Sequence, residues 1–413
     1  MARVAAALRR ARCDGGSHNL PEYPQWGVHL VKRPLQKEAG PSWWTALTVR
    51  RFGSRPRGAQ GPRATWDGVS EPEIDSAGGP GWSHLTRPNA SGSPSASNTG
   101  KGSRPLQVSV AMANYNYGRY LREAIDSALD QTIAPLEVVV VYDWSTDESR
   151  DVLASYGDRI VTVLTNNRGQ TTAINTAFDH CSGDVICLLD ADDLMLPRRV
   201  EYLIEAYTAH PECEWVFHGL NFVHRDTREA MVTPSRPDFT TGFHDERPFV
   251  RRGWVSMNAP ATSALSWRTS SLKGLLPVPA RVRIPDNYLK FASLATAPGW
   301  VIGDALCLQG IHESNMYTTM KDGDRRSFSL HNGVAMAPGF EGLGLRMLAE
   351  RFVADALVNA RGGSTLDSEH REILSAWLSG LSAIRRLRLA GFCAAVGADA
   401  VIERVRARIA TLR

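Results

Sequence analysis

Four aspartates close two apolar runs in the middle of the chain. Asp143 ends one run, and Asp190, Asp192 and Asp193 end another. Clustered carboxylates repel one another unless a cation or hydrogen-bond donors compensate their charge. Mg²⁺ and Mn²⁺ take such oxygen ligands and often complete their coordination with phosphate oxygens. These residues therefore indicate a divalent-cation site that could also hold a phosphorylated ligand, although a solvated acidic turn at a helix N-terminus is the plainer alternative.

The elements around these aspartates alternate between strand and helix patterns. Strands are expected at 106–112, 136–143, 160–164 and 185–190, with amphipathic helices at 118–130 and 171–180 and after residue 197. Strands that recur with helices between them predict βαβ units and an α/β fold with a largely parallel sheet. The carboxyl ends of parallel strands form the usual ligand-binding edge, so the aspartates should meet there.

Composition divides the chain into three parts. Residues 1–105 are rich in Gly, Pro, Ser and Arg and lack a structural period, so we interpret them as a disordered or spurious leader. The α/β domain should occupy 106–320, with only short strands and loops after 211, and a helical extension should follow at 321–413. Within that extension, helical spacing is expected from 340 onward, and 374–413 lacks proline and is apolar at helical spacing.

Charge and cysteine content limit the classes of function. Residues 1–105 hold 15 Lys and Arg against 7 Asp and Glu, so a chain of net charge +4 leaves −4 for the remainder. A mildly acidic body gives no support to a nucleic-acid partner. The six cysteines form no CxxC pair, and no apolar run reaches the roughly 18 residues of a membrane span. We expect a cytoplasmic protein, with peripheral contact to a membrane from the cytoplasmic side as an open alternative.

Three sequence blocks together resemble family 2 glycosyltransferases of the GT-A fold. The blocks are VSVAMANYNYGRYLREAIDSALDQT, LEVVVVYDWSTDES and NNRGQTTAINTAFDHCSGDVICLLDADDLMLP, and they agree with the family in order and spacing. The resemblance extends to about residue 312. It implies a GT-A type, mostly parallel sheet flanked by helices, with a C-terminal helical extension.

The resemblance also implies roles for individual residues. Asp192, Asp193 and His312 would hold the metal, with Asp192 as its foremost direct ligand, and Asp286 would be the catalytic base. The donor nucleotide sugar would be bordered by Asn114, Tyr115, Asn116, Tyr117, Asp143, Asn167, Gly169, Asn175, Asp190 and Ala191.

Three positions depart from the family pattern. Tyr142 stands where Asp is usual, Trp144 where Gly is usual, and Pro285 where Glu is usual before the base. A tryptophan at position 144 could narrow the pocket for the nucleobase of the donor or change the nucleotide preference. Pro285 makes the assignment of Asp286 less secure than that of the metal ligands, and an Asx-turn role for Asp286 stays open.

The implied reaction is metal-dependent, inverting transfer of a sugar from a nucleoside diphosphate sugar to an acceptor hydroxyl. Mn²⁺ or Mg²⁺ would be the cofactor, and a saccharide, a lipid-linked sugar or a protein the acceptor. Cell-envelope polysaccharide synthesis is the expected setting. A sugar-nucleotide nucleotidyltransferase is less favoured because such an enzyme would need a basic, Gly-rich loop after the first strand, and the loop found there has no lysine. A non-catalytic scaffold that binds nucleotide sugars remains a further alternative.

Overall fold

The computed structural model describes residues 104–227, 230–231, 240–254, 260–315, 322–360 and 365–410. The leader expected at 1–105 therefore lies outside the described residues, except for its last two. Among these residues, no helix is long and apolar enough to cross a membrane.

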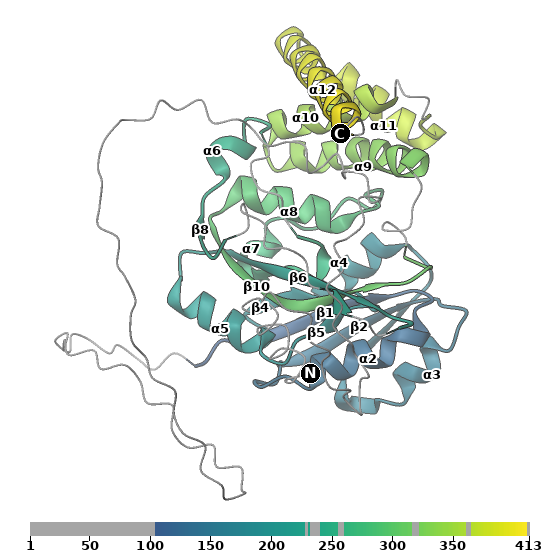
Figure 1. Ribbon diagram of the computed structural model, residues 1–413, viewed down its shortest axis with the longest axis vertical. Helices are drawn as coiled ribbons and strands as arrows, with labels where there is room; N and C mark the ends of the chain where they lie inside the picture. Colours follow the sequence, from purple (N-terminus) through teal and green to yellow (C-terminus); the bar gives the residue numbers. More distant parts are fainter. Residues whose placement is uncertain are drawn as a thin grey trace, which may run out of the picture. The chain divides into compact units, whose positions relative to one another are not determined.

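A ten-stranded sheet forms the centre of the described chain (Figure 1). Its main order is β3-β2-β1-β4-β9-β6-β10-β5, with β7 beside β6 and β8 beside β10. The strands are β1 (Val108–Asn114), β2 (Glu137–Asp143), β3 (Val161–Thr165), β4 (Val185–Leu188), β5 (Leu194–Met195), β6 (Trp215–His224), β7 (Ala230–Met231), β8 (Gly242–His244), β9 (Leu265–Arg268) and β10 (Gly299–Ile311).

Strand direction follows from the pairing. The pairs β1–β2, β2–β3 and β1–β4 are parallel, β9 runs antiparallel to both β4 and β6, and β10 is parallel to β6. The six strands β1, β2, β3, β4, β6 and β10 therefore all point the same way. The expected α/β fold with a mostly parallel sheet is confirmed, and β1, β2 and β4 end at one edge.

Helices cover both faces of the sheet. They are α2 (Gly118–Leu129), α3 (Ser149–Ala154), η1 (Gly157–Arg159), α4 (Gln170–His180), α5 (Arg199–Ala209), α6 (Arg247–Val250), η2 (Thr262–Ala264), α7 (Thr269–Lys273), α8 (Pro285–Thr296), α9 (Asp322–Gly342), α10 (Arg346–Ala360), α11 (Ser368–Ser379) and α12 (Ala383–Ala410). One buried cluster packs α2, α3 and α5 against β1, β2 and β4. The other packs α4 and α8 against the opposite face and continues into α9, α10 and α12.

The early strands and helices lie within two or three residues of their expected positions, but the second half of the domain is more regular than expected. β6 and β10 have 10 and 13 residues, so the expectation of short strands and loops after 211 was wrong. The register between them shifts at Ile302, Ala305 and Cys307, and these bulges break the alternation that marks a long strand in sequence. The helices of the extension begin at Asp322 rather than 340, and residues 374–410 contain the end of α11 and all of α12.

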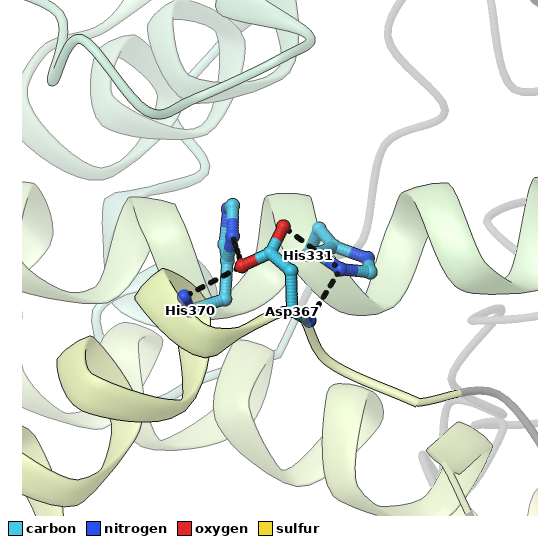
Figure 2. A group of neighbouring side chains, drawn as sticks. All are labelled: His331, Asp367 and His370. Carbon is cyan, nitrogen blue, oxygen red and sulfur yellow. Dashed lines mark hydrogen bonds and ion pairs between the residues drawn. The ribbon is translucent and has the colours of Figure 1, made fainter.

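A small polar cluster joins α11 to α9 (Figure 2). Asp367 is the N-cap of α11 and accepts hydrogen bonds from the backbone N–H and the ring Nδ1 of His370, at 2.9 and 2.7 Å. The backbone N–H of Asp367 donates to Nε2 of His331 in α9 over 3.2 Å. Although these side chains are also of metal-ligating types, their mutual hydrogen bonds are those of a helix cap that holds two helices together.

Candidate active site

The loops that follow β1 and β2 are tied together by side-chain hydrogen bonds. Ser145 Oγ accepts from the backbone N–H of Asn116 at 2.9 Å and from Asn114 Nδ2 at 3.3 Å. Asn116 Oδ1 in turn accepts from the backbone N–H of Thr146 at 2.7 Å. Asn116 has a positive φ of 58°, which asparagine tolerates better than most residues. Two of the predicted donor residues thus shape the loops, and their contact with a nucleotide stays a prediction.

The two tyrosines of the first loop have different surroundings. Tyr115 is 45% exposed, whereas Tyr117 points toward the later part of the site. The ring of Tyr117 lies 5.6 Å from that of His312, and its hydroxyl donates to the backbone oxygen of Ser314 over 3.4 Å. Burial, and next the charge of Asp192, raise the pKa of Tyr117. Tyr117 is therefore a neutral hydrogen-bonding group at ordinary pH.

Asp143 holds the loop between β3 and α4. Its carboxylate accepts from Thr165 Oγ1 and from the backbone N–H groups of Arg168 and Gly169, each at 2.9 Å. Gly169 adopts a φ of +85°, a conformation that favours glycine, and Asn167 is exposed in the same loop. The family resemblance predicts that Asp143, Asn167 and Gly169 border the donor nucleotide sugar. The hydrogen bonds show that Asp143 holds the β3–α4 loop in place, and its contact with the donor stays a prediction.

Asn175 lies on α4 and binds the segment that leads to α8. Its side-chain amide donates to the backbone oxygen of Val278 at 2.9 Å and accepts from the backbone N–H of the same residue at 3.0 Å. Thr171, one turn earlier, donates to the backbone oxygen of Val282. Asn175 thus positions the segment before the predicted base, and the predicted contact with the donor gains no support from its bonds.

The acidic loop, residues 190–193, meets the end of β10. Asp192 Oδ2 lies 2.9 Å from His312 Nε2 and accepts from Asn315 Nδ2 at 3.0 Å. Asn315 Oδ1 also accepts from the backbone N–H of His312 at 2.7 Å. The contacts of Asp192 join residues about 120 positions apart in the chain. Two of the predicted metal ligands, Asp192 and His312, therefore lie together.

The other two aspartates of the acidic loop, Asp190 and Asp193, contact different elements. Asp193 Oδ1 accepts from the backbone N–H of Gly310 at 2.7 Å, while its Oδ2 is buried without a hydrogen-bond partner among the described residues. The backbone N–H of Asp190 donates to Ser263 Oγ at 2.9 Å. Ala191, the next residue of the loop, is buried. These contacts fix the loop from β10 and η2.

The site carries more negative than positive charge. Burial and then the charge of Asp193 raise the pKa of Asp190, and the charge of Asp286 adds to this. Burial and then the charge of Asp192 raise the pKa of Asp193 to about 8. A divalent cation would relieve this repulsion, and the donor set of carboxylates and one imidazole suits it. The unpartnered oxygen of Asp193 points to the same deficit, so the residues fit the expected metal.

An aromatic stack supports the imidazole of His312. Its ring is stacked on Tyr120 of α2 with ring centroids 4.4 Å apart. The guanidinium of Arg225 lies over the same Tyr120 ring, 5.2 Å from its centroid, and pairs with Glu123 at 3.0 Å. A Cβ on Gly310 would collide with the backbone oxygen of Asp192. The close approach of β10 to the acidic loop therefore requires glycine.

Asp286 lies in the first turn of α8 and is buried. Its Oδ2 lies 2.9 Å from Lys290 Nζ, one turn further along the helix. Asn332 Oδ1, from α9, accepts from the backbone N–H groups of Arg283 and Ile284 at 2.9 and 3.0 Å. The helical extension therefore holds the N-terminal entry of the helix that carries the predicted base.

Several residues of the site were not assigned a role from the sequence. They are Tyr120, Arg225, Ser263, Lys290, Asn315 and Asn332. Asn315 follows His312 by three residues in the sequence. The others lie inside ordinary helix, strand or loop patterns, and only tertiary contacts distinguish them.

The comparisons with known proteins give the family. The profile described as glycosyl transferase family 2 matches residues 109–266. EpsE of Bacillus subtilis, which is named as a glycosyltransferase, is 30% identical to this chain over 267 residues. The match covers 62% of this chain and 89% of EpsE. The chain belongs to glycosyltransferase family 2. Its α/β sheet, flanking helices and C-terminal helical region agree with the GT-A fold expected for this family.

Other relatives of this family 2 member match more partially. An uncharacterised glycosyltransferase of Nostoc is 32% identical over 216 residues, covering 51% of this chain and 66% of the relative. The first four curated relatives are matched over 19% to 66% of their own length. Among solved structures, S. aureus TarS with UDP-GlcNAc matches with a TM-score of 0.49 and 15% identity, over 72% of this chain and 92% of that one.

Proposed function

We propose that this protein transfers a sugar from a nucleoside diphosphate sugar to an acceptor hydroxyl, with inversion and with the help of a divalent cation. The observation that carries the proposal is the convergence of Asp192, His312 and Asn315 beside two aspartates of raised pKa. Such a deficit of positive charge at the carboxyl ends of parallel strands suits a metal–diphosphate group.

Asp192 and His312 would hold the cation, and Asp193 would hold the acidic loop against β10. When bound, the cation would neutralise the charge that develops on the diphosphate leaving group. An imidazole ligand favours Mn²⁺ over Mg²⁺, since Mg²⁺ prefers oxygen ligands and retains its waters.

Asp286 is the proposed base. Its carboxylate would accept the proton of the acceptor hydroxyl as that oxygen attacks the anomeric carbon. Lys290, at 2.9 Å, supplies a counter-charge that stabilises a buried carboxylate and orients it along α8. A single displacement with one base inverts the anomeric centre and needs no covalent intermediate.

A thermal-shift screen tests the donor site. UDP, GDP, dTDP and CDP are each added with Mn²⁺, Mg²⁺ or EDTA, because a ligand of the folded state raises the melting temperature. We expect one nucleotide to give a shift that EDTA removes and that Asp192→Ala abolishes. Asp158→Ala, at an exposed acid of η1, is the control and should behave as the parent. A folded protein that responds to no nucleotide would favour the scaffold alternative.

A second experiment tests the base. Asp286→Asn should retain the parent dissociation constant for the nucleotide with metal, yet lose transfer to the acceptor. Full transfer activity in this variant would place the base elsewhere. The screen gives the nucleotide of the donor, and the acceptor is then sought among saccharides, lipid-linked sugars and proteins with radiolabelled sugar donors of that nucleotide.

A further inference from the structure

Trp144, directly after β2, has a backbone conformation that tryptophan seldom adopts. Its φ is +58°, in the left-handed region, and among the described residues Asn116 is the other non-glycine residue with positive φ. A large side chain in this region is strained, and such strain persists only where the surroundings impose it. Glycine, which the family usually has here, would carry none of this strain.

The neighbours of Trp144 impose the conformation from both sides. On one side, Asp143 is held by three hydrogen bonds from the β3–α4 loop. On the other, the Tyr142 hydroxyl donates to the backbone oxygen of Ser145 at 2.6 Å, and Ser145 Oγ accepts from Asn116. The residues beside Trp144 are thus fixed, and its own backbone must turn between them.

The indole itself makes no corresponding contribution to the fold. Its side chain is 59% exposed, and within the described part of the chain no hydrogen bond or ring contact engages it. Strain at a residue whose side chain stabilises nothing visible is typical of a functional position.

The location of the ring indicates what it could bind. Asn114 of β1 is paired with Tyr142 of β2, so the loops after these strands run side by side at the carboxyl edge of the sheet. Tyr115, 45% exposed, lies on the first of these loops and Trp144 on the second. Two exposed aromatic rings on neighbouring loops at this edge are suited to the face of a flat, aromatic ligand group.

We propose that Trp144 stacks on the nucleobase of the sugar donor. The proposal rests on the proposed function, since it requires a nucleoside diphosphate at this edge. Base–aromatic stacking strengthens binding by about fivefold to a hundredfold. The indole of Trp144 thus increases the affinity for the nucleotide, while its strained backbone conformation lowers the folding stability of the free protein.

The test uses three variants of the full chain. Trp144→Gly removes both the ring and the strain, Trp144→Ala removes the ring but keeps a Cβ, and Trp144→Phe keeps an aromatic ring. For each variant, calorimetry with Mn²⁺ gives the dissociation constant of the nucleotide selected by the thermal-shift screen. Inorganic pyrophosphate with Mn²⁺ is the second probe, because it has no base to stack.

We expect Trp144→Gly to raise the melting temperature of the free protein and to weaken nucleotide binding by at least about fivefold. Trp144→Ala should weaken binding equally without the gain in stability, and Trp144→Phe should retain most of the affinity. Pyrophosphate binding should not change in any variant. These opposite effects on stability and binding would not come from a structural tryptophan.

Two results would overturn the inference. Unchanged nucleotide affinity in Trp144→Gly and Trp144→Ala would do so, including the case in which only the KM for the acceptor rises. A loss of stability in Trp144→Gly together with equal losses for nucleotide and pyrophosphate would also do so, since the ring would then serve the fold. Failure of the parent protein to bind either probe would instead refute the proposed function, so the two failures are distinguishable.

Discussion

Asn332 provides the sharpest test of whether the helical extension serves catalysis. Its Oδ1 accepts two backbone hydrogen bonds at the entry to α8, and the residue is completely buried. In Asn332→Ala both backbone N–H groups lose their acceptor. A buried donor left without a partner costs about 1–3 kcal/mol, but Arg283 is exposed and Ile284 is partly so. Because water can replace part of the loss, we expect a total decrease of about 1–3 kcal/mol in the free energy of unfolding.

The effect on catalysis should be larger than this loss of stability suggests. A displaced α8 entry moves Asp286, the proposed base, and misplacement of a catalytic group by about 1 Å can lower the rate about a hundredfold. We expect kcat to fall about tenfold to a hundredfold, with the nucleotide dissociation constant unchanged. Steady-state kinetics at saturating donor and calorimetry with Mn²⁺ give the two quantities separately.

Two further variants control this experiment. Asn332→Asp keeps the oxygen acceptors and should recover most of kcat. Val353→Ala lowers stability within α10 without removing the hydrogen bonds of residues 283 and 284, and it should leave kcat unchanged at temperatures where the protein is folded. If Asn332→Ala loses stability but retains kcat, then either the extension does not position Asp286 or Asp286 is not the base.

Three other predictions concern the proposed metal site. Gly310→Ala should cost about 1–3 kcal/mol of stability through overpacking, as denaturant unfolding would show, and weaken Mn²⁺ binding, because its Cβ would displace the Asp192 backbone; parent-like metal affinity would contradict this. Since the raised pKa of Asp193 means that the folded state holds a proton lost on unfolding, the metal-free protein should lose stability as pH rises from about 4 to about 8. Over the same pH interval Mn²⁺ should bind more tightly as pH rises and should release protons, which calorimetry in buffers of different ionisation enthalpy would measure. An affinity for Mn²⁺ that does not depend on pH would argue against a cation site at the acidic loop. Tyr120→Leu should weaken Mn²⁺ binding while Tyr120→Phe should not, because the stacked ring rather than the hydroxyl orients His312; equal affinities in a calorimetric titration would exclude this role.

The sequence was informative where a local pattern coincides with a tertiary constraint. Strands β1, β2 and β4 are short, apolar and followed by polar loops, so their positions and their common edge were predictable. Asp192 and His312 could be paired only through the resemblance to the family, since 120 positions separate them. Their 2.9 Å contact agrees with that pairing, whereas the roles in metal and donor binding remain predictions.

Other features depend on contacts that no local pattern records. The bulges of β10 hide its length, and the buried polar atoms of Asn332 look in sequence like any other helical asparagine. Asn175 was assigned to the donor side because of its block, but its side chain faces Val278. Trp144 was recognised as a departure from the family, but its positive φ could be known only from the backbone.

The way β10 closes the site has a consequence for the order in which the protein is synthesised. The acidic loop leaves the ribosome well before Ser263, Gly310 and His312, which hold it through hydrogen bonds. A nascent chain that ends at residue 266, where the family profile also ends, has the aspartates of the acidic loop but lacks His312, Asp286 and the α9 helix. Such a chain cannot assemble the site, so catalytic competence arises only after β10 has inserted between β6 and β5 and the final helices have docked.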